Sequence, residues 1–140
     1  MIQEDRQILL KDISSRLPYG VRYRRFAWDD EREEECISAK IYSISPDGYV
    51  RNCYDDETVY IDDVRPYLFP LSSMTEEQKK EYQYITERWM YDSSYSISDS
   101  TDWLNKNHFD YRNLIDKNLA IDATGLNIYK QRRNNYERQH

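Results

Sequence analysis

The sequence predicts an α+β fold: an N-terminal helix on a small, bent antiparallel sheet, followed by three C-terminal helices. Three features of the 140-residue chain lead to this class. An apolar stripe at helical spacing comes first, short alternating segments joined by turn residues follow, and helical patterns begin at residue 72. We expect one domain, with helix and sheet over 1–71, a helical part over 72–129 and a basic tail over 130–140. An SH3-like barrel is one form that such a sheet can take.

The first helix is expected over residues 5–17. Leu9, Ile13 and Leu17 recur every four residues, which places them on one helical face. Pro18 and Gly20 in "LPYG" then end the helix.

Four short strands are expected next, at residues 21–28, 36–44, 49–54 and 57–62. In the "SPDG" segment between the second and third strands, Pro46 fixes φ and Gly48 accepts a positive φ, which predicts a hairpin. The following segment, 63–71, is not expected to pair regularly, because Pro66 and Pro70 cannot donate to a strand ladder.

The clearest helical signal covers residues 72–90. Thr75 is a suitable N-cap, and Gln78 three residues later completes a capping box. The side chains that recur at helical spacing, and that we expect to be buried together, are Tyr82, Ile85 and Trp89.

Two further short helices, 101–109 and 110–118, and a last strand at 119–123 complete the expected elements. Asp110 would be the N-cap of the second of these helices, with Phe109 and Leu114 forming a hydrophobic staple and Asn118 a left-handed C-cap. As an N-cap, Asp110 would contribute about 1 kcal/mol to stability.

Charge and hydropathy restrict the classes of partner. The net charge is −6, while residues 130–140 carry four basic residues against one acidic residue. An acidic body argues against direct nucleic-acid binding. No apolar run approaches the ~18 residues of a membrane span, and the N-terminus does not look like a secretory signal. We therefore expect a cytoplasmic protein with no membrane partner, whose Cys36 and Cys53 are reduced thiols.

The sequence contains no pattern that indicates catalysis, a metal or a cofactor. CxxC, HxxxH, HExxH, GxSxG, GxxxxGK and GxGxxG are all absent. The acidic run at 29–35 indicates a solvated loop. Cys36 follows that run and Cys53 lies close to Asp55, and neither neighbourhood favours a thiolate. We expect a non-enzymatic protein with no catalytic residue, no metal and no cofactor.

The segments "RPYLF" and "HFDYR" both contain aromatic residues and an arginine. Such residues can hold a nucleotide by stacking and charge, or they can pack in the core while the arginines extend to solvent. The candidate residues for binding a ligand or partner are Arg65, Tyr67, Trp103, His108, Tyr111 and Arg112.

Two segments carry a resemblance. "VRPYLFPLSSMTEEQKKEY" and "DWLNKNHFDYRNLIDKNLAIDATGLNIY" closely resemble a family of small uncharacterised proteins of gut bacteria, their prophages and phages. The resemblance covers residues 64–79 and 102–129 and is weaker over 1–63. Asn107 stands where that family often has a second histidine. The resemblance implies a mobile-element protein that acts inside a bacterial cell.

Two functions are expected from these features. The first is binding to a host protein, by which a phage or mobile-element protein modulates host machinery, including immune defence; an acidic, tyrosine-rich surface suits a basic face of such a partner. The alternative is a sponge that sequesters a small, cyclic nucleotide signal, for which a homo-oligomer is a suitable form.

Overall fold

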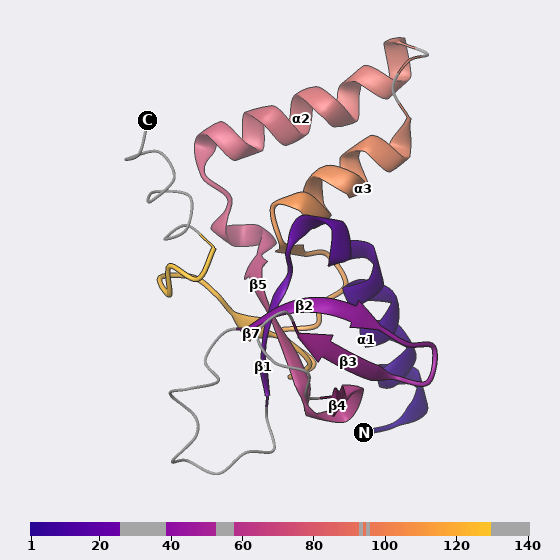
Figure 1. The fold of residues 1–140 in the computed structure, drawn as a ribbon. Coiled ribbons are helices and arrows are strands. Elements are labelled where there is room, and N and C mark those ends of the chain that lie inside the picture. Colours follow the sequence, from indigo (N-terminus) through magenta and orange to yellow (C-terminus); the bar gives the residue numbers. More distant parts are fainter. Residues whose placement is uncertain (26–38, 53–57, 93, 95, 130–140) are drawn as a thin grey trace, which may run out of the picture.

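The computed structural model describes residues 1–25, 39–52, 58–92, 94 and 96–129 (Figure 1). The expected acidic loop at 29–35, both cysteines and the basic tail at 130–140 lie outside the described residues. Within the described part of the chain, no helix is both long and apolar enough to cross a membrane.

Helix α1, Gln3–Arg16, begins and ends within two residues of the expected first helix. Leu9 and Ile13 on its inner face are fully buried. A short 3-10 helix, Leu17–Tyr19, follows, and Gly20 ends it with a left-handed φ of 72°. Glycine suits this position because it has no Cβ to oppose a positive φ.

Within the described residues the sheet has seven strands, of which the first five form an antiparallel framework. The strands are β1 (Arg22–Arg25), β2 (Ala39–Ile44), β3 (Tyr49–Asn52), β4 (Thr58–Tyr60), β5 (Val64–Pro70), β6 (Phe109–Asp110) and β7 (Ile121–Asp122). The order is β4-β3-β2-β1-β5-β6, and β7 also pairs with β5. Both β6 and β7 run parallel to β5. The expectation of a purely antiparallel sheet is therefore wrong, because the chain returns to β5 after the helices in the same direction.

Strand β5 also corrects the interpretation of 63–71 as an irregular segment. Its prolines are tolerated because β5 changes partners along its length. Tyr23 of β1 lies opposite Pro66, β7 pairs at Tyr67 and Leu68, and β6 pairs at Phe69 and Pro70. No single ladder therefore depends on every N–H group of the strand.

The expected β2–β3 hairpin is present. The Gly48 N–H donates to the Ser45 carbonyl at 2.9 Å, and Gly48 has a φ of 91°. A Cβ at Gly48 would lie 3.1 Å from Ile61 Cγ2, so this turn needs glycine for space as well as for φ.

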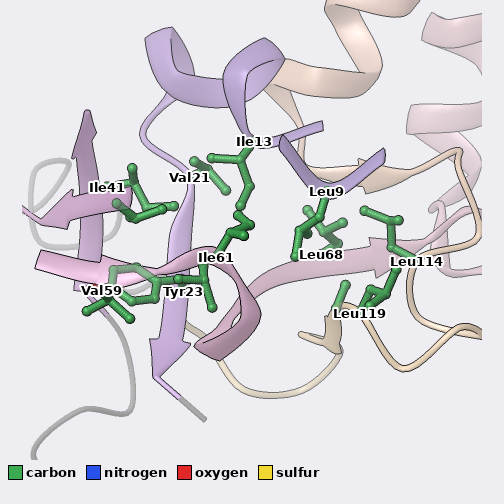
Figure 2. Close-up of a cluster of buried hydrophobic side chains, with 13 residues drawn as sticks. Leu9, Ile13, Val21, Tyr23, Ile41, Val59, Ile61, Leu68, Leu114 and Leu119 are labelled. Carbon is green, nitrogen blue, oxygen red and sulfur yellow. The ribbon is translucent and has the colours of Figure 1, made fainter. Parts of the chain in front are cut away.

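The main core lies between α1 and the inner face of the sheet (Figure 2). Leu9 and Ile13 of α1 pack there against buried side chains of the strands. The buried strand and loop residues of this cluster are Val21, Tyr23, Ile41, Val50, Val59, Ile61, Val64, Leu68, Leu114, Leu119 and Ala120. The core orients the end of α1 against β1 and β2.

Helices α2 (Glu76–Tyr91) and α3 (Ile97–Lys106) form a hairpin that extends from the sheet (Figure 1). The capping box of Thr75 and Gln78 is confirmed at the start of α2. Tyr82 lies 5.4 Å from Trp103 of α3, between ring centroids, within a second apolar cluster that also contains Ile85. The side chain of Trp89 is outside the described set.

The third C-terminal helix, expected at 110–118, is wrong. Asn113 has a φ of 60°, which interrupts any helix begun at Asp110. A single turn follows, and Asn118, with a φ of 63°, ends it as the expected left-handed residue. The Leu119 N–H donates to the Leu114 carbonyl, and the Asn118 N–H donates to the Ile115 carbonyl, as in a Schellman motif.

Candidate functional site

A pocket of about 430 Å³ opens beside the end of α1, the start of β1 and the loop after α3. Its volume lies within the range of small-molecule sites. The residues that line it are Pro18, Tyr19, Gly20, Arg22, Lys40, Lys106, His108 and Tyr129. They come from four separate segments of the chain, which the sheet brings together.

The pocket is cationic although the chain is acidic overall. Arg22, Lys40 and Lys106 line it, and the described lining contains no carboxylate. Arg22 and Lys40 are directly opposite each other on β1 and β2. Neither lysine forms an ion pair with another residue in the described part of the chain.

Lys40 passes close to Gly20. A Cβ at Gly20 would lie 3.4 Å from Lys40 Cε, which is ordinary van der Waals contact. The left-handed φ of 72°, and not space, is therefore what favours glycine at this position.

His108 is the buried aromatic side of the pocket. It follows α3 with a φ of 62°, a conformation that is uncommon for a residue with a side chain. The residue is 7% exposed, and its Nδ1 has no hydrogen-bond partner in the described structure. Burial, with a smaller contribution from the charge of Arg16, lowers the pKa of His108 to about 3. The imidazole is therefore neutral at pH 7.

The pKa of His108 predicts a pH dependence of stability. The unfolded chain binds a proton near pH 6.5, whereas folded His108 does so only near pH 3. The contribution to stability is therefore complete above pH 6.5 and is lost as the pH falls toward 3, at no more than about 1.4 kcal/mol per pH unit. Asparagine tolerates the positive φ, so we expect His108→Asn to fold but to have a lower free energy of unfolding than the unaltered chain at pH 7. This difference between the two chains should become smaller in acid. Urea unfolding of both chains from pH 7 to pH 4 measures this; two parallel stability curves would contradict it.

Tyr129 lines the pocket next to His108. Its ring stacks on His108 with centroids 3.7 Å apart and planes 12° apart. Its hydroxyl accepts from the Arg22 N–H at 2.9 Å and donates to the Tyr67 carbonyl at 2.8 Å. Burial is the main reason that the pKa of the Tyr129 hydroxyl is raised, so it remains protonated and can make both hydrogen bonds.

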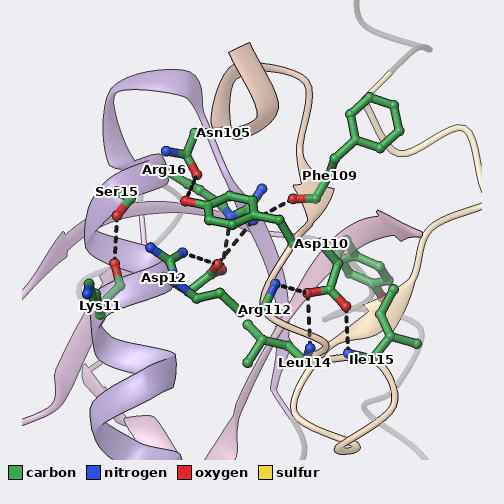
Figure 3. A network of polar contacts seen from close by, with 12 residues as sticks. Lys11, Asp12, Ser15, Arg16, Asn105, Phe109, Asp110, Arg112, Leu114 and Ile115 are labelled. Carbon is green, nitrogen blue, oxygen red and sulfur yellow. Dashed lines mark hydrogen bonds and ion pairs between the residues drawn. The ribbon is translucent and has the colours of Figure 1, made fainter. Parts of the chain in front are cut away.

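A network of buried charges joins α1 to the loop after β6 (Figure 3). Asp12 and Arg16, both with fully buried side chains, form an ion pair at 2.9 Å. Asp12 also accepts from Arg112 at 2.6 Å, and Arg16 donates to the Phe109 carbonyl at 2.6 Å. This network fixes β6, and with it His108, against the end of α1.

Asp110 holds the loop after β6 by its carboxylate (Figure 3). It accepts from the backbone N–H groups of Leu114 at 3.0 Å and Ile115 at 2.9 Å, with a longer contact of 3.3 Å to that of Arg112. The expected role of Asp110 as a helix N-cap is wrong, because no helix follows it; its carboxylate binds the amides of a turn instead. The expected hydrophobic staple is wrong, because Phe109 and Leu114 lie in different apolar clusters.

Of the six candidate binding residues, His108 alone lines the pocket. Trp103 of α3 is buried beside Phe109 in the second apolar cluster. Tyr67 is buried in β5. The other three make structural contacts. Arg65 donates to backbone carbonyls including that of Asn118. Arg112 binds Asp12 and lies over the Tyr111 ring, whose hydroxyl donates to Asn105.

Sequence reasoning missed Tyr19, Arg22, Lys40, Lys106 and Tyr129 as pocket residues. They are far apart in the chain, and each alone looks like a solvated or packing residue. One signal was present: two of them lie within 102–129, the segment that carries the stronger resemblance.

The described residues contain no group of three or more His, Cys, Asp or Glu side chains placed to hold a metal ion. The chemistry on offer in the pocket is instead cationic and aromatic, which suits an anion that carries a planar group. No family model, curated protein or solved structure matches this chain.

Proposed function

We propose that this protein binds a small phosphorylated ligand, of the nucleotide class, in the pocket lined by Lys40 and Lys106, and does not convert it. The single observation that carries the proposal is the gathering of three cationic side chains around about 430 Å³, without a carboxylate among the described lining residues. Phosphate oxygens are the acceptors that best match such a set. The neutral, buried imidazole of His108 adds an aromatic face for stacking.

Sequestration is the role that fits such a site in the cellular context implied by the sequence resemblance. A mobile-element protein that holds a signalling nucleotide lowers its free concentration and so weakens the host defence that depends on it. Sequestration requires no second reactant and no nucleophilic side chain in the pocket.

The proposal is tested by calorimetric titration with pyrophosphate, adenosine monophosphate and a cyclic dinucleotide. We expect Lys40→Ala and Lys106→Ala each to weaken binding about tenfold or more, since each removes a charge-assisted hydrogen bond. Lys79→Ala is the matched control: it removes the same charge from the exposed face of α2. Equal losses in all three variants would indicate nonspecific attraction, and binding that survives both pocket substitutions would contradict the proposal.

A second candidate function, docking on a host protein, rests on a different surface. Four apolar or aromatic side chains on the α2–α3 hairpin are more than half exposed: Tyr84, Met90, Tyr91 and Ile97. Tyr91 is 82% exposed, so most of its aromatic ring is open to contact with a partner. If this hairpin binds a host protein, replacing Met90 and Tyr91 by serine should abolish capture of that protein from lysate, whereas Tyr42→Ser on the sheet should not.

A further inference from the structure

The pairing of β1 with β5 stops one step short of the pocket. Tyr23 lies opposite Pro66, so the next pair in this register would join Arg22 to Tyr67. The Tyr129 hydroxyl lies between these two backbones instead and bonds to both, at 2.9 Å and 2.8 Å. The gap between the strands thus presents one backbone donor and one backbone acceptor, side by side, to the group that occupies it. We call this gap, together with the facing side of His108, the aromatic slot.

The aromatic slot has the shape of a stacking site as well as a hydrogen-bonding edge. The Tyr129 ring lies nearly parallel to the imidazole, 12° apart in plane and 3.7 Å apart between centroids. The Phe69 ring is tilted against the Tyr129 ring, with the two ring centroids 6.0 Å apart. A flat ring that carries an acceptor and a donor on one edge would keep every one of these contacts.

The segment that carries Tyr129 has few other attachments in the described structure. Residues 124–127 are exposed, and the hydrogen bonds found within 124–128 are short-range: Thr124 N–H to the Asp122 carboxylate and Leu126 N–H to the Ala123 carbonyl. Among the described residues, the hydrogen bonds that join this segment to the strands of the sheet are those of the Tyr129 hydroxyl. Segments held by so few contacts open at low free-energy cost.

We propose that Tyr129 occupies a base-binding slot, and that the base of a nucleotide displaces it. The base would stack on His108, accept from the Arg22 N–H and donate to the Tyr67 carbonyl, while its phosphate reaches Lys40 and Lys106 in the same pocket. Adenine carries the required edge, with N1 as acceptor beside the N6 amino group as donor. This inference rests on the proposed function and adds to it the ligand class and a built-in competitor.

Adenosine monophosphate and ribose 5-phosphate form a matched ligand pair, because they differ only in the base. Removing the competing ring by Tyr129→Ala should strengthen binding of adenosine monophosphate about tenfold, the equivalent of two modest hydrogen bonds that no longer have to be replaced. Binding of ribose 5-phosphate, which has no base to place in the slot, should not be strengthened. Adenosine monophosphate methylated at N1, which lacks the acceptor, should gain nothing from the substitution.

Hydrogen exchange on the unaltered chain gives a second measurement, which decides the matter if Tyr129→Ala does not fold. Saturating adenosine monophosphate should make the amides of 124–128 exchange about tenfold faster while Arg22 stays protected, whereas a ligand that binds beside Tyr129 would slow the whole segment. Slower exchange at 124–128, or equal affinities of the two ligands in both chains, would overturn the slot but leave the anion pocket standing. Failure of pyrophosphate and both ligands to bind either chain would overturn the proposed function as well.

Discussion

Replacing Asp12 by alanine is expected to destabilise this protein by about 3–5 kcal/mol. The Asp12 carboxylate is fully buried and, among the described residues, is the only carboxylate that pairs with two arginines, Arg16 at 2.9 Å and Arg112 at 2.6 Å. Without it, the guanidinium of Arg16, whose Nη1 already has no partner in the described structure, is left in the core with a carbonyl as its main acceptor. A loss of this size is a large part of the roughly 5–15 kcal/mol that stabilises an ordinary domain.

Chemical denaturation of Asp12→Ala measures this loss, and Asp62→Ala is its matched control. Asp62 also accepts two hydrogen bonds from one arginine, Arg6, at 2.8 Å and 2.9 Å, but both side chains are more than a quarter exposed. An exposed pair of this kind contributes no more than about 1 kcal/mol. If the two substitutions cost the same, the buried network does not have the structural role assigned to it.

Asp110→Ala is expected to cost about 2–4 kcal/mol, well above the ~1 kcal/mol of a helix N-cap. Its two carboxylate oxygens hold the backbone amides of Leu114 and Ile115 at 3.0 Å and 2.9 Å, and the Leu114 contact is buried. Alanine would leave these donors unpaired. Asp110→Asn should destabilise the protein less than Asp110→Ala, because its one side-chain oxygen can still accept a hydrogen bond.

The matched control for Asp110 is Asp122→Ala. Asp122 also accepts a backbone N–H, that of Thr124 at 2.9 Å, but at an exposed turn where water replaces it. We expect Asp122→Ala to change the free energy of unfolding by less than about 1 kcal/mol. A cost for Asp110→Ala close to that of its control would mean that the loop after β6 is held by other contacts.

Features set by neighbouring residues could be predicted from the sequence. The capping box of Thr75 and Gln78 and the turn at Gly48 each depend on groups within three residues of one another. The errors arose where distant segments decide. Pro66 disfavours a strand locally, yet β5 forms because three other strands pair along it.

In the loop after β6, a local helix signal did not lead to a helix. Asp110 has the residue type and the following pattern of an N-cap, and its carboxylate does cap backbone amides. The left-handed Asn113 turns the chain before a helix can form, and no local rule distinguishes this outcome from a helix. The pocket was harder still to predict, because Lys40 and Lys106 are far apart in the sequence and line one pocket only in the folded chain.

Binding of phosphate in the cationic pocket can be measured by an amide NMR titration of the full chain with pyrophosphate. We expect saturable shifts at Gly20, Lys40 and Lys106, with residues of α2 unaffected. Ribose 5-phosphate should shift the same set. Shifts confined to residues outside the pocket, or a chain that shows none up to millimolar pyrophosphate, would contradict it.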